Sequence, residues 1–410
     1  MSVNGRYDTV IIGGGQAGLA MSRCLEDHDR EHVILERARV AERWRRERWD
    51  TLRFQFPNWT IQLPGERTEG TEPDGFATAG EIAALLEWYA ATNHAPVIEG
   101  CEVTALVRGS QMDGFRLTTT KGEVRALNVV VATGPFQRPA IPALSAELPQ
   151  HVLQLDPTRY RNGRELPPGA VLVVGSGASG AQIADDLLRA GRTVYLSVSS
   201  HRRMPRRFRG KDIFWWLEKL GRFELTVDDL PGGRRPPGLL VTGVDGGYDL
   251  TMYGLAADGV RLAGHVVAVN DEVVTFADDA ADTLRQADQA YEDFLEAARK
   301  GASGLEDELL PEDGQPAMAP KPIEGARSLD LRAESVGTVI WATGYEYAYD
   351  WLHLPVLDDG GAPIQRRGIA QERGLYFIGL HWMHTLRSGL LMGVGADAQY
   401  LAEHMDERLS

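Results

Sequence analysis

The chain has 410 residues, of which 43% are hydrophobic and 25% charged, and both values are typical of globular proteins. It carries 43 Lys and Arg against 58 Asp and Glu, a formal net charge of −15 at pH 7. Such a surface repels nucleic-acid phosphates and anionic lipids, which argues against both as main partners. No apolar run approaches the roughly 18 residues of a membrane span. The two isolated cysteines, Cys24 and Cys101, fit a reducing compartment, so we expect a cytoplasmic protein without a secretion signal.

The first glycine-rich turn lies between two predicted strands. Apolar patterning predicts a strand over residues 7–12, a helix over 19–27 and a strand over 32–35. The turn reads Gly13-Gly14-Gly15-Gln16-Ala17-Gly18, in which the first glycine permits a tight turn and the third residue lets a pyrophosphate approach the backbone. The last glycine lets the helix pack closely on the strand. Glu36 ends the second strand, where a carboxylate binds ribose hydroxyls, so this unit predicts a dinucleotide site.

The same arrangement recurs in the middle of the chain. A strand is predicted over residues 170–174, a helix over 181–190 and a strand over 193–196. The turn reads Gly175-Ser176-Gly177-Ala178-Ser179-Gly180. The position that matches Glu36 is Val198, so the second unit lacks the acid.

Hydroxyl and basic side chains follow the second unit in place of that acid. The chain continues Ser199-Ser200-His201-Arg202-Arg203, and Arg206 comes soon after. Loss of the acid and gain of such donors is what a 2′-phosphate requires, so we expect NADPH rather than NADH at this site. The alternative is that the arginines form a solvated surface run.

The remaining segments suggest how the two units are connected. Residues 129–134 and 339–344 are predicted strands that each end in Ala-Thr-Gly. Residues 280–299 have the apolar spacing of an amphipathic helix, and an acidic loop follows over 301–322. A last helix is predicted over about 389–408.

Two dinucleotide sites in one chain imply electron transfer between two cofactors, of which one is normally a flavin. We therefore expect an α/β fold with two Rossmann-like dinucleotide-binding domains, the NADP domain inserted into the FAD domain. The predicted domains are 1–160 and 336–410 for the two parts of the FAD domain, and 161–335 for the NADP domain.

The sequence resembles the flavin-containing monooxygenases among the two-dinucleotide-binding-domain flavoproteins. Beyond both glycine motifs, the resemblance is carried by Val-Ile-Leu-Glu36-Arg37, by the two Ala-Thr-Gly strands and by residues 374–379. The segment Trp44-Arg45 … Trp49-Asp50-Thr51-Leu52-Arg53 … Phe56-Pro57 … Leu63-Pro64 is similar to the plant indole-pyruvate monooxygenases in particular. The resemblance implies FAD at the first site and NADPH at the second.

The chain departs from this family at two places. Where the family's linker fingerprint has His, this chain has Asp156, followed by Pro157, whereas Tyr160 matches. Baeyer–Villiger members have Trp at the position of Tyr160, which weakens that assignment. Several members place an Asn beside the flavin where this chain has Phe56, with Asn58 two residues on.

A segment near the C-terminus holds the remaining candidate pocket residues. The resemblance implies that the last helix points its N-terminus at the flavin, where the helix dipole stabilises negative charge. His381, Trp382 and His384 precede this helix and are candidates for the pocket, or alternatively packed interface residues. Phe214-Trp215-Trp216 and Trp341 fit core packing better than a substrate entrance.

The motifs and the resemblance give two sets of cofactor residues, and no metal-ligand spacing was found beside them. The expected FAD residues are Gly13, Gly15, Gln16, Ala17, Gly18, Glu36, Arg37, Trp44, Val103, Thr133, Gly134, Gly379, Ser388, Gly389 and Leu390. The expected NADP residues are Gly175, Ser176, Gly177, Ala178, Ser179, Gly180, Ser199, Ser200, Arg202, Arg203, Arg206, Ala342, Thr343 and Gly344.

The leading hypothesis is an FAD- and NADPH-dependent monooxygenase that inserts one atom of O2 into a small organic substrate through a C4a-(hydro)peroxyflavin. One alternative is an NADPH-dependent flavin reductase, or an amine oxidase or dehydrogenase, without oxygen transfer. A second is a flavin-binding regulatory protein without enzyme activity. The substrate, the type of oxygenation and the oligomeric state, a homo-oligomer included, stay open.

Overall fold

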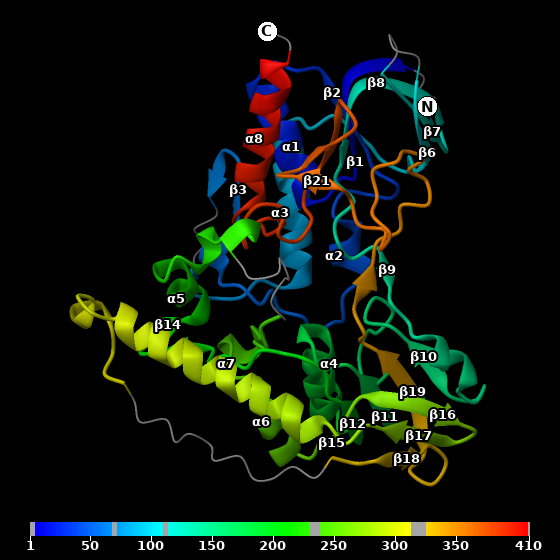
Figure 1. Ribbon diagram of the computed structural model, residues 1–410, viewed down its shortest axis with the longest axis vertical. Helices are drawn as coiled ribbons and strands as arrows, with labels where there is room; N and C mark the ends of the chain where they lie inside the picture. Colours follow the sequence, from blue (N-terminus) through cyan, green and yellow to red (C-terminus); the bar gives the residue numbers. More distant parts are fainter. Residues whose placement is uncertain (1–4, 68–71, 110–113, 230–237, 313–324, 409–410) are drawn as a thin grey trace.

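Two large β-sheets organise the chain, a mixed sheet that contains the strand before the first glycine-rich turn and a parallel sheet that contains the strand before the second (Figure 1). The structure is a computed structural model that describes residues 5–67, 72–109, 114–229, 238–312 and 325–408. In Figure 1 the first sheet and both described chain ends lie at the top, and the second sheet lies at the bottom. None of the described helices is long and apolar enough to span a membrane.

The first sheet has the order β21-β22-β23-β8-β1-β2-β5, with β7 pairing to β8 and β6 to β7. Strand β1 lies between β2 and β8 and runs parallel to both, and β23 runs parallel to β8. Segments from both ends of the chain therefore share one sheet. The strands are β1 Gly5–Ile12, β2 His32–Leu35, β5 Val97–Ile98, β6 Val103–Arg108, β7 Phe115–Thr119, β8 Gly122–Val131, β21 Gln365–Arg366, β22 Ile369–Ala370 and β23 Leu375–Phe377.

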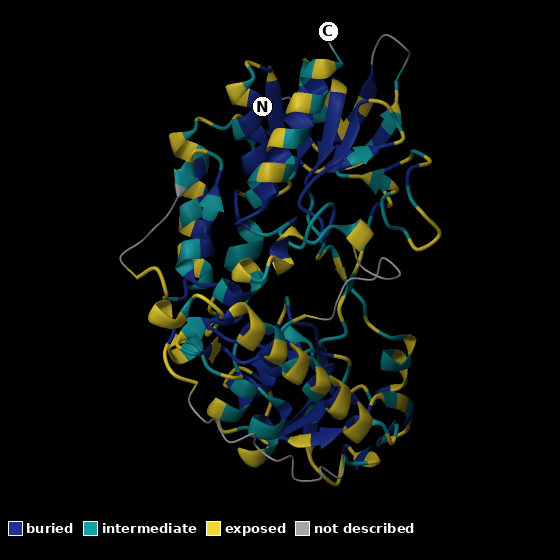
Figure 2. Ribbon diagram, turned by 60° about the vertical axis from the view of Figure 1, so that its left-hand side comes forward, coloured by how far each residue is buried: buried dark blue, intermediate teal, exposed yellow. Residues whose placement is uncertain are grey.

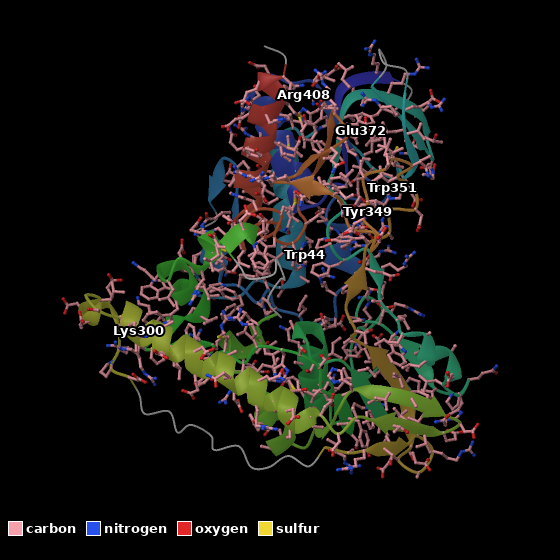
Figure 3. The ribbon with its side chains drawn as sticks, in the orientation of Figure 1. Trp44, Lys300, Tyr349, Trp351, Glu372 and Arg408 are labelled. Atoms are coloured by element: carbon pink, nitrogen blue, oxygen red, sulfur yellow. The ribbon has the colours of Figure 1, made fainter. Side chains whose placement is uncertain are left out.

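Helices α1 (Gln16–Asp27), α3 (Ala79–Thr92) and α8 (Val394–Glu407) cover one face of this sheet, because their apolar residues form one buried cluster. Fully buried members such as Leu86 and Leu401 belong to it. The opposite face is covered by β6, β7 and the segment around Tyr349 and Trp351, whose rings lie 6.1 Å apart (Figure 3). The short helix α2 (Glu42–Arg46) follows β2.

The second sheet has the order β10-β19-β11-β12-β15, and all its strands are parallel. Helices α4 (Ala178–Arg189) and α6 (Met252–Ala257) pack on one face, and the antiparallel sheet β16-β17-β18 packs on the other. The strands are β10 Leu153–Leu155, β11 Ala170–Val174, β12 Val194–Ser197, β15 Arg261–Ala263, β19 Val336–Trp341, β16 Val266–Asn270, β17 Val273–Phe276 and β18 Ser328–Asp330. The tryptophans Trp216 and Trp341 are fully buried core residues.

Two helices between β12 and β18 lie outside this pattern. Helix α5 (Ile213–Lys219) and the predicted amphipathic helix, which is α7 (Ala280–Gly301), pack against each other through an apolar cluster that includes Phe214 and Phe294. Figure 2 shows α7 with exposed residues along its outer face and buried residues beneath. Of the predicted acidic loop, residues 313–322 lie outside the described part of the chain.

The two sheets repeat one local geometry. The backbone N–H of Ala132 donates to the carbonyl of Ile12 at 2.9 Å, and that of Ala342 donates to Val174 at 2.8 Å. The second Ala-Thr-Gly strand, β19, is therefore the counterpart of β8 within its own sheet. The domain boundaries predicted at residues 160 and 335 stay a prediction. Strands β10 and β19 both belong to the second sheet, which favours boundaries before β10 and after β19.

A buried carboxylate joins the linker between the sheets to both of them. Tyr160 donates its hydroxyl to Asp186 of α4 at 2.5 Å, and Thr51 of the first unit donates to the same carboxylate at 2.6 Å. Asp156 accepts hydrogen bonds from the backbone and hydroxyl of Thr158 and so closes a local turn. The aspartate that replaces the fingerprint histidine thus shapes the linker.

We expect Tyr160→Phe to lower the free energy of unfolding by about 2 kcal/mol, because a buried hydrogen bond to a charged group is lost. Urea denaturation followed by intrinsic fluorescence measures the change. Tyr7→Phe is the matched control, since the Tyr7 hydroxyl has no hydrogen-bond partner among the described residues. Equal stability of the two variants would contradict a role for the Asp186 contact.

Candidate functional site

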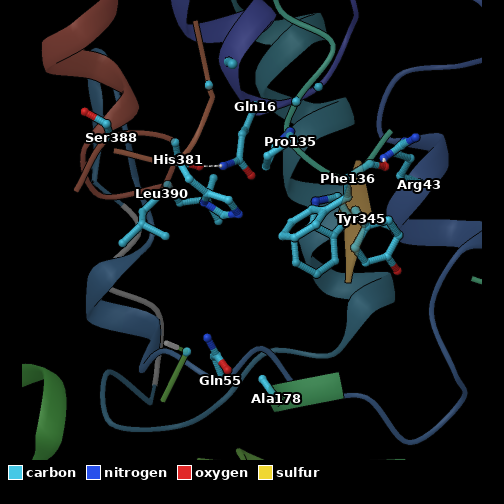
Figure 4. Close-up of a pocket in the computed structure, with 18 of the residues that line it drawn as sticks. Gln16, Arg43, Gln55, Pro135, Phe136, Ala178, Tyr345, His381, Ser388 and Leu390 are labelled. Atoms are coloured by element: carbon cyan, nitrogen blue, oxygen red, sulfur yellow. Dashed lines mark hydrogen bonds between the residues drawn. The ribbon is translucent and has the colours of Figure 1, made fainter. Parts of the chain in front are cut away.

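Both glycine-rich turns open into the same cavity, which has a volume of about 1250 Å³. The first turn and the C-terminal segment form one side, and the second turn forms the other. Figure 4 shows Gln16, Pro135 and His381 on one side, with Gln55 and Ala178 across from them. The cavity therefore lies between the two sheets, where two dinucleotides could meet.

The glycines of the first turn divide into two kinds. Gly13 has φ +114°, and a Cβ built there would lie 2.6 Å from the carbonyl oxygen of Ala132. A Cβ on Gly18 would lie 1.9 Å from the carbonyl oxygen of Gly13, so both positions require glycine for packing. Gly15 has an ordinary φ of −90° and nothing within 4 Å of its Cβ position. Its missing side chain leaves space open at the cavity rather than relieving a clash.

The second turn repeats this division. Gly175 has φ +101° and its Cβ would lie 2.5 Å from the carbonyl oxygen of Ala342, whereas a Cβ on Gly180 would lie 1.8 Å from Gly175. Gly177 has φ −64° and no atom within 4 Å of its Cβ position. The two turns thus present equivalent open cradles to the one cavity.

Helices α1 and α4 begin at these cradles without a side-chain cap. Gly15 and Gly177 are their N-cap residues, and neither helix receives a capping hydrogen bond from a side chain. Their first-turn N–H groups and the positive ends of their dipoles are free for an anion. An open backbone cradle and an uncapped helix N-terminus fit the pyrophosphate of FAD at the first turn and that of NADPH at the second.

The acid expected beside the first turn lies there. Glu36 accepts hydrogen bonds from the backbone N–H of Gly14 at 2.7 Å and of Ala38 at 2.8 Å, and it lines the cavity. In the second unit the hydroxyl of Ser199 accepts from the backbone N–H of Ser176 at 2.9 Å. A neutral hydroxyl therefore takes the place of the carboxylate.

The three arginines predicted for the 2′-phosphate do not lie together. Arg202 lines the cavity. Arg203 instead pairs with Asp288 at 2.8 Å and lies over the ring of Tyr291. Arg206 is 1% exposed and pairs with Asp212. Arg203 is thus already paired with an acid far along the chain, and Arg206 with one a few residues on. Neither is among the cavity-lining residues, and their assignment to a phosphate stays a prediction.

Arg206 has a structural role instead. It donates to Asp212 at 2.6 Å and to the carbonyl oxygen of the cavity residue Gln55 at 2.7 Å. We expect Arg206→Ala to lower the free energy of unfolding by about 3–5 kcal/mol, since Asp212 would be left buried without its partner. Arg207→Ala removes an exposed neighbouring guanidinium, so urea denaturation should show a much smaller loss for this control. Equal losses would contradict the assignment.

The cavity brings together most of the predicted FAD residues and fewer of the NADP residues. It is lined by Gly13, Gly15, Gln16, Ala17, Glu36, Arg37, Trp44, Val103, Thr133, Gly134, Gly379, Ser388, Gly389 and Leu390 from the first set, and by Gly177, Ala178, Ser179, Arg202, Ala342 and Gly344 from the second. The residues Gly18, Gly175, Ser176, Gly180, Ser199, Ser200, Arg203, Arg206 and Thr343 are not among its lining residues.

The C-terminal segment reaches the cavity as a series of turns. Helix α8 begins at Val394, later than predicted, so the cavity residues Ser388, Gly389 and Leu390 precede it. Gln16 donates to the carbonyl oxygen of Gly389 at 2.6 Å, which ties this segment to the first turn (Figure 4). We expected the N-terminus of the last helix to point at the flavin, but the turn that precedes α8 lines the cavity instead.

The candidate pocket residues separate into two groups. His381, Trp382 and Phe56 line the cavity, whereas His384 and Asn58 do not. Burial and the nearby charge of Arg367 lower the pKa of His384. Asn58 donates to the carbonyl oxygen of Glu72 at 3.0 Å.

Several lining residues were not predicted. Phe136 and Tyr345 follow the two Ala-Thr-Gly strands, and their rings lie edge to face at 5.1 Å (Figure 4). His381 contacts Phe136 at the same centroid distance. Arg43 and Arg48 also line the cavity, and burial lowers the pKa of both guanidinium groups. The repeated strand end was a signal for the aromatic pair, whereas nothing in the local sequence marked the arginines.

Comparison with known proteins agrees with this architecture. Residues 10–218 match the pyridine nucleotide-disulphide oxidoreductase family. A CzcO-like oxidoreductase of Geobacillus kaustophilus (strain HTA426) is 34% identical over 96% of this chain and 97% of its own length. An oxidoreductase CzcO of Bacillus subtilis (strain 168) is 31% identical over 98% and 99% of the two chains. A probable indole-3-pyruvate monooxygenase of Arabidopsis thaliana, YUCCA8, is 30% identical over 52% of each chain.

Among solved structures, a flavin-containing monooxygenase from Stenotrophomonas maltophilia superimposes with a TM-score of 0.68 at 19% identity, covering 99% of both chains. The chain belongs to the pyridine nucleotide-disulphide oxidoreductase family and, within it, groups with the CzcO-like oxidoreductases. It is an oxidoreductase, which disagrees with the non-enzymatic alternative. The α/β fold class and the resemblance to flavin-containing monooxygenases are confirmed.

Proposed function

We propose that this chain is an FAD- and NADPH-dependent monooxygenase that transfers one oxygen atom of O2 to a small organic substrate. The observation that carries the proposal is that two equivalent cradles, at Gly15 and Gly177, open into a single cavity. When bound, the two cofactors supply hydride transfer from nicotinamide to flavin and the reaction of reduced flavin with oxygen. The protein's own tasks are binding, orientation and exclusion of water.

We assign the binding of the two cofactors to the two glycine-rich turns and their neighbours. The uncapped N-terminus of α1 at Gly15 holds the pyrophosphate of FAD, and Glu36 accepts from its ribose. The N-terminus of α4 at Gly177 holds the pyrophosphate of NADPH. The link between Gln16 and Gly389 fixes the C-terminal wall against the FAD cradle.

The cavity extends past both cradles into an apolar region, which supports oxygen transfer over simple flavin reduction. Phe56, Phe214 and Phe223 line it together with Leu386 and Leu390. A volume of about 1250 Å³ exceeds the 300–1,000 Å³ range typical of a single small-ligand site. The cavity is therefore larger than a single small-ligand site, and its apolar region offers a surface for an organic substrate.

Labelled oxygen gas tests the proposal. The FAD-loaded protein is mixed anaerobically with NADPH, and loss of the oxidised-flavin absorbance reports the first half of the reaction. Methyl phenyl sulfide, N,N-dimethylaniline and cyclohexanone are then offered under labelled oxygen, and products are analysed by mass spectrometry. Label in a product is the expected result. Reduction by NADPH with all oxygen recovered as hydrogen peroxide, for every probe, would favour the reductase or oxidase alternative.

A further inference from the structure

Part of the cavity is lined by leucines whose side chains are half-buried. Helix α5, the residues that follow it and the segment before α8 contribute them. Because each side chain lines the cavity and keeps part of its surface exposed, apolar surface is open to a ligand there. We call these residues the leucine set, and they are Leu217, Leu220, Leu225, Leu239, Leu386 and Leu390.

Backbone bonds and packing hold the leucine set together. The backbone N–H of Leu386 donates to the carbonyl oxygen of Leu225 at 3.3 Å, and that of Val227 donates to His384 at 3.1 Å. Two segments far apart in the sequence therefore run side by side. All members of the set except Leu225 also pack against the buried cluster that joins α5 to α7 and contains Phe294. The set thus forms one end of the cavity, beside two helices that lie outside the repeated units of the cradles.

Helix α7 contributes a further wall to this end. Its cavity-lining residues are Ala290, Asp293, Phe294 and Ala297, and their spacing places them on one face of the helix. From Ala290 to Ala297 this face runs about 10 Å along the helix axis, which suits an extended chain. Ala290 and Ala297 are half-buried, and their methyl groups leave room that a longer side chain would take up.

Polar side chains are scarce at this end of the cavity. Of the cavity-lining residues that the structure describes between 214 and 297, only Arg222 and Asp293 are polar. Both are exposed, so they lie where this end meets solvent. A polar group held among the leucines would leave water without gaining a hydrogen bond from a side chain, which costs free energy, whereas an apolar group gains from burial. This end therefore favours an apolar body.

We propose that the leucine set and the lining face of α7 hold an aliphatic chain of the organic substrate, and that Ala290 and Ala297 limit the length of chain that fits. The inference rests on the proposed function and deepens it, because it names a substrate class for the same cavity. Leu390 directly follows Gly389, which Gln16 ties to the first turn. A chain that begins at Leu390 therefore has its other end beside the FAD cradle.

Binding of a homologous series of alcohols to the FAD-loaded protein tests the site without turnover. 1-Butanol, 1-hexanol and 1-octanol differ only in chain length, and calorimetry in the absence of NADPH gives their dissociation constants. Burial of one methylene contributes about 0.8 kcal/mol, so we expect the affinity to rise about fourfold per methylene. A rise of less than about twofold per methylene would overturn the proposal.

Variants of α7 test where the chain lies. Ala290→Leu and Ala297→Leu should each weaken binding of 1-octanol about tenfold, as expected when about two methylenes lose their burial, and leave 1-butanol nearly unaffected. Leucine is a good helix former, so α7 should persist, which circular dichroism checks. Ala281→Leu is the matched control, because Ala281 is an exposed residue of α7 that does not line the cavity. Affinities that are unchanged, or changed equally for both alcohols, in both lining variants contradict the role of α7.

A titration with NADP+ present separates this site from the second cradle. Saturating NADP+ should leave the affinity for 1-octanol nearly unchanged, because the two ligands occupy different parts of the cavity. Displacement of 1-octanol by NADP+ would assign the leucine set to the dinucleotide and overturn the inference. Chain-length dependence without labelled oxygen in any product contradicts the proposed function alone, whereas label without chain-length dependence contradicts this inference alone.

Discussion

Gly15→Leu is expected to yield a folded protein that no longer retains FAD. Leucine fits the backbone there, because φ is −90° and nothing lies within 4 Å of the Cβ position. The side chain would instead occupy the space in which a pyrophosphate approaches the first turn of α1. Loss of two hydrogen bonds to a charged group, at about 1.5 kcal/mol each, weakens binding about 100-fold or more. The measurement is the flavin content of the purified protein and the dissociation constant on reconstitution.

Gly18→Ala serves as the contrasting variant in the same turn. Its Cβ would lie 1.9 Å from the carbonyl oxygen of Gly13, so we expect a general loss of stability rather than a selective loss of FAD. Circular dichroism and thermal unfolding distinguish the two effects. Retention of FAD at full occupancy in Gly15→Leu would contradict the placement of the cofactor at this turn.

Gly177→Leu is expected to separate the two cofactors. Gly177 has an ordinary φ of −64° and the same open Cβ position, so the substitution should leave the fold and FAD retention unchanged. NADPH would lose its contact with the first turn of α4. By the same reasoning as for Gly15, we expect the rate of flavin reduction at low NADPH concentration to fall about 100-fold or more. Anaerobic stopped-flow absorbance measures it.

Chemical reduction supplies the control for this second variant. Dithionite should still bleach the flavin of Gly177→Leu at the rate seen in the unaltered protein, because it does not need the second cradle. Reduction by NADPH at an unchanged rate would place the nicotinamide dinucleotide elsewhere. The two glycine variants thus report on the two cradles independently.

The turns were predictable because their chemistry is local. A strand that passes through a tight turn into a helix brings backbone atoms very close together within a few residues. In the structure Gly13 and Gly18 lie at such positions, where a Cβ would clash with a backbone carbonyl oxygen. The repeat at Gly175 and Gly180 follows for the same reason. The fold class was therefore readable from spacing alone.

The arginines were not predictable in the same way. A run of basic residues after β12 looks alike whether each one meets a ligand or an acid. Asp288, which neutralises Arg203, comes from helix α7 far along the chain, and Asp212, which neutralises Arg206, is brought to it by a tight local hairpin. Similarly, the predicted boundary at residue 335 places β19 in the second part of the FAD domain, whereas β19 pairs with β11. Such pairings depend on tertiary contacts that local patterns do not contain.

The bond between Gln16 and Gly389 has a consequence for the order in which the protein matures. One part of the flavin cradle comes from the start of the chain, and the adjoining part, with strand β23, comes from its far end. During synthesis the C-terminal segment therefore leaves the ribosome long after the first glycine-rich turn. Flavin loading should follow completion of synthesis, and chains stalled before β23 should emerge colourless even though their glycine motif is intact.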